Sequence, residues 1–183
     1  MSQKKPQPLV YSVWATAWGP VGAVAGERGL CRFVLPHYPL RDLEQLLAWE
    51  HKAAVRDDAP FAELVPLTRD YFNGQVVDFT SVACDMPPEG SFSGLVLRAC
   101  RQIPYGQTLG YLGLAKQIGR DDAARAVATA LSKNNIPLII PCHRVIYSGG
   151  GMGGFTAEGG TQLKRRMIEM EKKNRPPAKE DKS

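Results

Sequence analysis

The sequence predicts an α+β protein whose chain divides into two structured parts. Residues 1–86 are expected to form a small N-terminal α/β domain, built from a β-hairpin sheet plus helices. Residues 87–175 are expected to form a mostly helical, winged-helix-like domain that contains a helix-turn-helix, and residues 176–183 a disordered basic tail. Strand patterns fill the start of the chain, the proline-rich stretch 85–91 interrupts both kinds of pattern, and helical patterns dominate after it.

Four segments of the first part are rich in the β-branched and aromatic residues that favour strands. The tripeptide Glu27-Arg28-Gly29 predicts a hairpin turn between the second and third of them. The predicted strands are 9–17, 21–26, 30–36 and 76–82. Two helices are expected between the third and fourth strands, at 40–55, where the leucines recur with helical spacing, and at 60–72.

The first three helices expected in the second part each follow a residue that can cap a helix. Gly119 ends the second of them, and the short Gly119-Arg120 connection indicates a helix-turn-helix. An apolar run at 136–141 is expected to be an extended, buried strand. The expected caps and helices are Ser91 for 92–103, Thr108 for 109–118, and Asp121 or Asp122 for 123–133, with a final basic helix at 160–173.

Composition restricts the class of protein. Apolar residues make up 44% of the 183 residues, enough for a hydrophobic core, and no stretch approaches the ~20 apolar residues of a membrane span. The N-terminus has no apolar signal core, and the four cysteines form no C-x-x-C pair. We therefore expect reduced thiols, no metal, no membrane, and a location in the cytoplasm, or in the nucleus if the organism is eukaryotic.

The charge is unevenly distributed along the chain. Residues 1–90 carry 8 Lys/Arg and 11 Asp/Glu, a net charge of −3, whereas residues 91–183 carry 15 Lys/Arg and 7 Asp/Glu, a net charge of +8. A basic second half indicates a polyanionic partner, nucleic acid first. The alternative is a basic solvated surface with a charged tail.

Cys142 and His143 are the candidate reactive pair. A cysteine is nucleophilic as its thiolate, and a nearby histidine can take its proton. On an extended backbone the two side chains would point to opposite faces, so a bridging water is the expected link. The alternative is a structural thiol, because free cysteine is among the most buried residue types.

Two further features accompany the pair. Five glycines between 149 and 154 let the backbone approach a ligand closely, and they match no phosphate-binding motif; they indicate a pocket wall or, alternatively, a flexible surface loop. Five alanines make the helix at 123–133 narrow, with Arg125 as its one positive charge before Lys133. Such a helix can lie close against DNA or pack against a neighbouring helix, and opposite faces can do both.

These motifs together resemble the O6-alkylguanine-DNA alkyltransferases, also called methylated-DNA–protein-cysteine methyltransferases. The resemblance covers about Phe92 to Glu171, and Pro-Cys-His-Arg-Val is the signature of the family. The N-terminal part carries no motif of its own. The matching segments are FSGLV (92–96), IPYGQT (103–108), YLGLA (111–115), ARAV (124–127), IPCHRV (140–145) and a closing KRRMIEMEKK (164–173).

The resemblance implies a reaction and roles for five residues. Cys142 would accept an alkyl group, in one irreversible step, from O6 of guanine or from O4 of thymine in DNA. His143 would act on the thiol through a water, and Glu171 would orient that histidine. The thiol would then ionise at a pH below the pKa of ~8.5 of a free cysteine. Tyr111 would press the target phosphate and help protonate or hydrogen-bond the leaving base, and Asn134 would hold the turn before the cysteine.

The resemblance also implies how the substrate is held. The partner would be double-stranded DNA carrying O6-alkylguanine, bound by a monomer without a cofactor. Arg125 would fill the gap left by a flipped-out guanine, and Ala124 and Ala126 would allow approach through the minor groove. The carbonyls of Cys142 and Val145 would read the guanine amine. The pocket residues would be Val145, Phe155 and Thr156.

Two positions depart from the pattern of the family. Gly110 stands where many relatives have Ser or Thr, which removes a hydroxyl expected on the phosphate side. Glu158 places an acid near the expected pocket rim, where it would narrow the pocket or disfavour DNA contacts. The alternative function is a non-enzymatic protein that binds alkylated bases. Such alkyltransferase-like proteins replace the cysteine, so the presence of Cys142 favours the enzyme.

Overall fold

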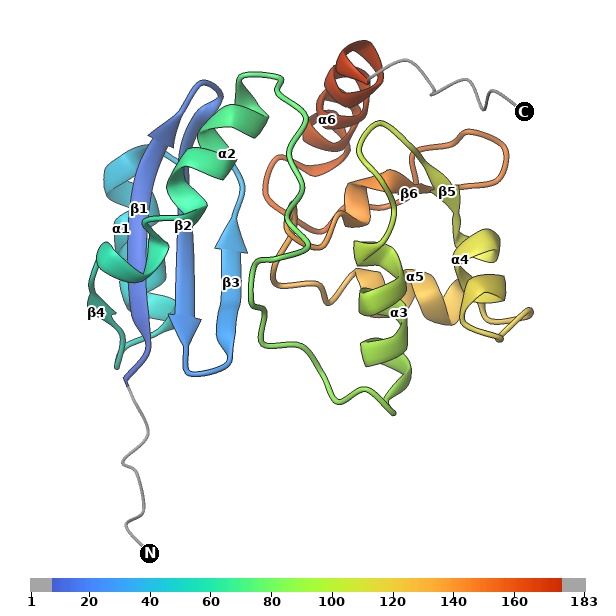
Figure 1. The fold of residues 1–183 in the computed structure, drawn as a ribbon, viewed down its shortest axis with the longest axis horizontal. Coiled ribbons are helices and arrows are strands. Elements are labelled where there is room, and N and C mark those ends of the chain that lie inside the picture. The colour runs from blue at the N-terminus through green and yellow to red at the C-terminus, as the bar shows by residue number, and fades with distance from the viewer. Residues whose placement is uncertain (1–7, 176–183) are drawn as a thin grey trace, which may run out of the picture.

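The computed structural model describes residues 8–175, and the N-terminal part is a four-stranded mixed sheet covered by helices (Figure 1). Strands β1 (Val10–Thr16), β2 (Gly19–Gly26) and β3 (Gly29–Val34) are antiparallel neighbours. The two-residue β4 (Val55–Arg56) adds in parallel to β1, giving the order β3-β2-β1-β4. The expected α+β class is confirmed. The expected tail, 176–183, lies outside the described residues.

The three predicted N-terminal strands are confirmed, and so is the hairpin turn before β3. Gly29 has a φ of 102°, and a Cβ there would lie 2.4 Å from the backbone of Ala83. Only glycine meets both conditions. The backbone of Leu30 then bonds to the 83–85 segment, with Leu30 N–H donating to the Ala83 carbonyl at 2.9 Å.

The two predicted N-terminal helices exist but are shorter than expected. Helix α1 is Leu40–Glu50, and the expected helix 60–72 is a 3-10 turn, η1 (Ala59–Phe61), followed by α2 (Leu64–Phe72). The prediction that α1 runs to residue 55 is wrong. Val55 N–H donates to the Leu9 carbonyl at 2.9 Å, so this segment pairs with the edge of β1 instead. Pairing satisfies backbone groups that the edge would otherwise leave open.

The predicted strand at 76–82 is wrong. Val77 and Phe79 are buried, as the apolar pattern suggested, but the segment joins no sheet. The Arg101 guanidinium donates to the carbonyls of Phe79, Thr80 and Val82. A side chain therefore satisfies the backbone acceptors that a neighbouring strand would have taken.

The second part is mostly helical, as predicted. Ser91 caps the first helix by accepting a bond from Gly94 N–H at 3.0 Å, but Thr108 caps nothing, because Leu109 and Gly110 form a strand. Asp121 and Asp122 are not caps either; Ala123 holds that position without a side-chain bond. The elements are α3 (Phe92–Arg101), β5 (Leu109–Gly110), α4 (Tyr111–Gln117), α5 (Ala124–Leu131), η2 (Cys142–Arg144), β6 (Val145–Ile146) and α6 (Gly160–Asn174).

The apolar run at 136–141 is a buried turn rather than the expected strand. Ile140 N–H donates back to the Ile136 carbonyl at 2.9 Å, and Leu138 adopts a φ of 75°. Left-handed conformations are costly for a branched side chain, so packing holds Leu138 there. The turn is followed by Pro141 and leads directly into the short η2 turn, which Cys142 begins.

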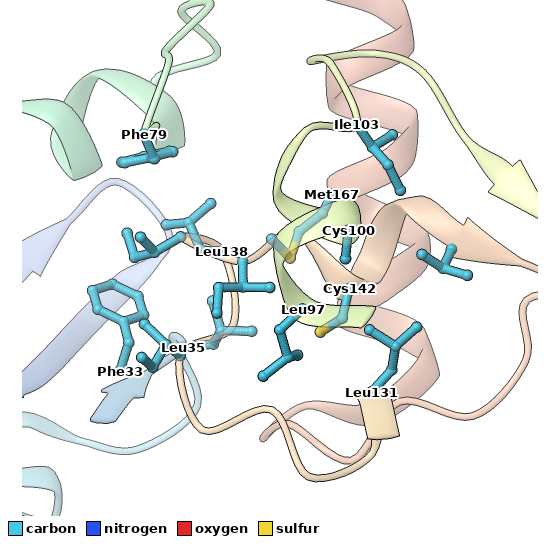
Figure 2. Packing of buried hydrophobic residues seen from close by; sticks show 14 of the residues in the cluster. Phe33, Leu35, Phe79, Leu97, Cys100, Ile103, Leu131, Leu138, Cys142 and Met167 are labelled. Atoms are coloured by element: carbon cyan, nitrogen blue, oxygen red, sulfur yellow. The ribbon is translucent and has the colours of Figure 1, made fainter. Parts of the chain in front are cut away.

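The core joins the two parts of the chain. One cluster of buried side chains runs from the α2 face of the sheet into the helical part, and a smaller one lies between the sheet and α1. The helices α1 and α2 cover opposite faces of the sheet (Figure 1). Figure 2 shows Leu138 between Phe33 on the sheet side and Cys100 on the helical side, with Cys142 beyond. The turn that carries the cysteine is thus packed against both parts.

Candidate active site

Cys142 is the first residue of η2 and is 8% exposed. Its Sγ accepts a hydrogen bond from Asn134 Nδ2 at 3.1 Å. The same amide group donates to the Ile140 carbonyl at 2.9 Å, and Asn134 Oδ1 accepts from Ile136 N–H at 3.0 Å. Asn134 therefore bonds to both ends of the turn and also contacts the sulfur.

His143 follows in η2 and is fully buried. Its Nε2 lies 2.8 Å from Glu171 Oε1, on α6. A carboxylate can only accept, so Nε2 carries the proton, and Nδ1 is the basic nitrogen of the neutral ring. Nδ1 has no hydrogen-bond partner among the described residues. Burial lowers the pKa of His143, although Glu171 acts to raise it. The ring is therefore neutral at pH 7.

Glu171 is saturated with donors. Besides His143, its carboxylate accepts from Tyr71 Oη at 2.7 Å, Gly106 N–H at 3.0 Å, and Arg144 Nε and Nη2 at 2.9 and 3.0 Å. Burial alone would raise the pKa of Glu171, but His143 and the Arg144 guanidinium hold it well below its usual range. The acid is therefore ionised at all physiological pH values.

Burial raises the pKa of the Cys142 thiol in this state, although Asn134 and Lys164 act in the opposite direction. This direction is opposite to the expectation that the thiol ionises more readily than a free cysteine. A site closed from water disfavours the thiolate more than one amide donor and one cation stabilise it. The thiol is protonated at rest and needs a base when it reacts.

Cys142 opens into a cavity of about 290 Å³. Of the predicted pocket residues, Phe155 and Thr156 line it, while the side chain of Val145 does not. Arg125 and Tyr111 also line it. Together with Cys142, the lining residues are Tyr111, Arg125, Ala128, Thr129, Leu131, Ser132, Tyr147, Gly154, Phe155 and Thr156. A larger cavity of about 450 Å³, walled by Phe79, Arg101 and Arg144, does not include the cysteine.

Tyr111 begins α4 and is buried against the glycine loop. Gly153 has a φ of 66°, and a Cβ there would lie 2.6 Å from Tyr111 Oη, so the loop closes on the hydroxyl only because this residue is glycine. The Tyr147 ring lies 5.2 Å from the Tyr111 ring. Burial, with a smaller effect of Tyr147, raises the pKa of Tyr111, which therefore keeps its proton. Gly110 precedes Tyr111 as an N-cap without a side-chain bond.

Sequence reasoning missed Lys164, which it counted as part of a basic helix. The side chain is fully buried, and Nζ donates to the Val145 carbonyl at 2.7 Å and to the Gly154 carbonyl at 3.5 Å. Nζ also lies 5.9 Å from the Tyr111 ring centre and 6.0 Å from that of Phe155. Only its place at a helical spacing of seven from Glu171 marks it in the sequence.

Helix α5 has one buried face and one exposed face. Val127 and Leu131 are buried against α3 and α4, and Ala124 is half-buried with them. Arg125 and Ala126 are exposed. One face of the alanine-rich helix thus packs against its neighbours, and the other is narrow and open.

The glycine-rich loop is attached at its far end. Thr156 Oγ1 donates to the Ser132 carbonyl at 2.8 Å, and Glu158 Oε1 pairs with Arg32 Nη2 of β3 at 2.8 Å. Glu158 therefore faces the N-terminal sheet and does not line the cysteine cavity. Within residues 8–175, no three His, Cys, Asp or Glu side chains gather as metal ligands would, and no helix is long and apolar enough to cross a bilayer.

Comparison with known proteins gives consistent results. Residues 91–173 match the model of the 6-O-methylguanine DNA methyltransferase DNA-binding domain. A methylated-DNA–protein-cysteine methyltransferase of Mycobacterium tuberculosis is 38% identical over 137 residues, 75% of this chain and 81% of that protein. One of Methanosarcina acetivorans is 31% identical over 164 residues, 89% of this chain and 98% of that protein.

Solved structures agree with the sequence matches. The crystal structure of the Mycobacterium tuberculosis O6-methylguanine methyltransferase superposes with a TM-score of 0.76 at 32% identity, covering 93% of this chain and 96% of that one. A structure of Mycobacterium tuberculosis OGT in complex with DNA gives a TM-score of 0.73 at 30% identity, covering 90% and 93%. With these matches, the chain belongs to the methylated-DNA–protein-cysteine methyltransferase family, the O6-alkylguanine-DNA alkyltransferases.

Proposed function

We propose that this chain repairs DNA by moving an alkyl group from O6 of guanine to Sγ of Cys142, once per molecule. The observation that carries the proposal is a cysteine that lines a base-sized cavity and is followed by a histidine. That histidine has a carboxylate on Nε2 and, within residues 8–175, no hydrogen-bond partner on Nδ1. A simple structural thiol would need neither the cavity nor the relay. O4-alkylthymine, which presents a similar alkoxy carbon, is a second expected substrate.

The relay supplies a route for the thiol proton. A water between Cys142 and His143 passes the proton to Nδ1, and the anionic Glu171 stabilises the imidazolium that forms. The thiolate attacks the alkyl carbon in line, the S–C bond forms, and the C–O6 bond breaks. Guanine leaves with the electron pair, and the hydroxyl of Tyr111, which keeps its proton at neutral pH, donates to the departing base.

The target base must leave the duplex to reach Cys142. Flipping costs a few kcal/mol, which a wedge offsets by restacking the gap. Arg125 has the position for this role, because it is exposed on α5 and also lines the mouth of the cavity. The exposed Ala126 and the half-buried Ala124 leave α5 slim enough for the minor groove. The net charge of +8 over residues 91–183 supports binding to the phosphates.

Backbone groups are expected to recognise the guanine. The Cys142 carbonyl accepts from Val145 N–H, and the Val145 carbonyl accepts from Lys164. Each carbonyl keeps a second lone pair, which can take a hydrogen of the exocyclic amine. Phe155 provides an apolar wall, and a backbone amide near Thr156 donates to O6.

The product explains the single turnover. A thioether in a buried site has no ready route to hydrolysis, so the alkylated chain is spent. We expect a monomer that acts without cofactor wherever the genome lies, in the cytoplasm of a prokaryote or the nucleus of a eukaryote.

Intact-mass measurement after incubation with O6-methylguanine duplex tests the proposal. The expected result is a gain of one methyl group, located on Cys142, in the wild type. The Cys142→Ala variant should keep its affinity for the alkylated duplex and gain nothing. Tight binding without any mass gain in the wild type would point to a lesion-binding protein. A methyl group on Cys100 would show that Cys100, and not Cys142, is the acceptor.

A further inference from the structure

Tyr71 lies in the N-terminal part of the chain, at the end of α2, yet its hydroxyl reaches the relay of the helical part. Tyr71 Oη donates to Glu171 Oε1 at 2.7 Å, and it lies 3.5 Å from His143 Nε2. One hundred residues of sequence separate Tyr71 from Glu171. We propose that Tyr71 is a positioning residue for the transfer reaction, so that the N-terminal sheet domain completes the relay beneath Cys142.

The phenol is held too firmly to be an incidental neighbour. Tyr71 is fully buried, and its ring packs edge-on against Phe72 and Tyr105, at 5.2 and 6.0 Å between ring centres. Helix α2 is in turn tied to the sheet, where Trp14 Nε1 donates to Thr68 Oγ1 at 2.8 Å. The sheet therefore fixes the place of the hydroxyl.

The hydroxyl stays a donor throughout the working pH range. Burial, the charge of Glu171 and the hydrogen bond to it raise the pKa of Tyr71 well above its usual range. The same Oε1 accepts from Tyr71, from His143 at 2.8 Å and from Arg144 Nη2 at 3.0 Å. Three donors on one oxygen share its electron density, so each one limits how strongly the others are held.

Tyr71 therefore has two effects on the histidine. It holds the carboxylate of α6 through a donor on α2, and it restrains the basicity that Glu171 gives to the ring. The groups that act on the charge of His143 come from α2, η2 and α6. They are Tyr71, Arg144, Lys164 and Glu171.

This inference rests on the proposed function and makes a prediction for one atom. Tyr71→Phe removes the hydroxyl and keeps the ring. With one donor fewer on Oε1, the pKa of His143 should rise, and the pH at which Cys142 reacts half-maximally with a thiol-alkylating probe should fall by about half a unit. Because the carboxylate is held less firmly, the rate of methyl transfer from O6-methylguanine duplex at pH 7.5 should fall about threefold to tenfold.

Tyr105→Phe is the matched control, because Tyr105 is a buried neighbour in the same aromatic cluster, and no hydrogen bond joins its hydroxyl to Glu171. The control should keep the wild-type pH profile and rate. A downward shift in Tyr71→Phe alone supports the proposal. An unchanged or upward-shifted profile, or the same shift in Tyr105→Phe, overturns it, even if melting temperatures fall. A wild type that gains no methyl group at all would instead refute the proposed function.

Discussion

Arg32 Nη2 lies 2.8 Å from Glu158 Oε1, which links β3 to the far end of the glycine-rich loop. The same guanidinium holds Glu50 through Nε at 3.1 Å. Glu158 is two residues from Thr156, so the ion pair fixes the loop segment that walls the cysteine cavity. Glu158, which the sequence placed at the pocket rim, thus lies outside the cavity and attaches the loop to the N-terminal sheet.

Glu158→Ala should weaken substrate binding more than it slows the chemistry. A loosened wall forms the pocket less often, so the concentration of O6-methylguanine duplex for half-maximal rate should rise about fivefold, or about 1 kcal/mol. The limiting rate should stay within about twofold, because the relay is untouched. Single-turnover rates across a range of duplex concentrations give both values. Glu50→Ala leaves the loop attached and should match the wild type; equal effects from the two variants would contradict the idea.

Arg125→Ala should slow repair of duplex DNA by about tenfold or more, and reaction with the free base O6-methylguanine by less than about twofold. The free base needs no flipping, so the arginine has nothing to replace there. Parallel single-turnover assays with the two substrates measure the ratio. Arg120→Ala removes a nearby exposed positive charge and should weaken duplex binding only through its salt-dependent part. Equal losses of Arg125→Ala on both substrates would place Arg125 in the chemistry or the fold.

Glu171→Gln should raise the pH at which Cys142 reacts with an alkylating probe and should slow methyl transfer. The amide cannot stabilise an imidazolium as the carboxylate does, so His143 becomes a weaker base. Profiles between pH 6 and 9 bracket the ordinary histidine and cysteine pKa values. Glu169→Gln, on the exposed side of α6, is the control. Wild-type reactivity of Glu171→Gln across that range would show that the Cys142–His143–Glu171 relay does not operate.

The buried relay should also make the fold sensitive to acid. The pKa values of His143 and Glu171 both lie below their ordinary values, so the unfolded chain binds more protons, and stability falls as the pH drops. The loss should begin below about 6.5, from His143, and continue below about 4.3, from Glu171. Urea unfolding at several pH values measures it.

Glu171→Gln should be about 3 kcal/mol less stable than the wild type at pH 7, because Arg144 loses its buried partner. That gap should shrink below about pH 4, where the carboxylate advantage of the wild type is lost. A constant gap between pH 7 and pH 3 would mean that the charge of Glu171 does not stabilise the fold.

The sequence predicted the local features well where local chemistry decides them. Ser91 caps α3, Gly29 makes the hairpin turn, and the leucine spacing starts α1 at Leu40, because each depends mainly on residues close by in the sequence, although Gly29 must also fit against Ala83. Prediction from the sequence failed where a residue distant in the chain bonds to the backbone of the segment. The 76–82 segment has the apolar content of a strand, but Arg101 takes its carbonyls, and β1 takes residues 55 and 56 away from α1.

For the site, the sequence by itself determined the candidate groups, through its motifs and through the family resemblance that they carry. These groups are Cys142, His143, Glu171, Asn134, Tyr111 and Arg125. Only the tertiary structure decided the protonation of these groups and the residues that they contact. Burial raises the pKa of the thiol, and packing brings Tyr71 to Glu171 and Arg32 to the glycine-rich loop from positions that no local pattern marks. The physical reason is that residue types fix which bonds a side chain can make, whereas desolvation and long-range contact depend on how the two parts of the chain pack together.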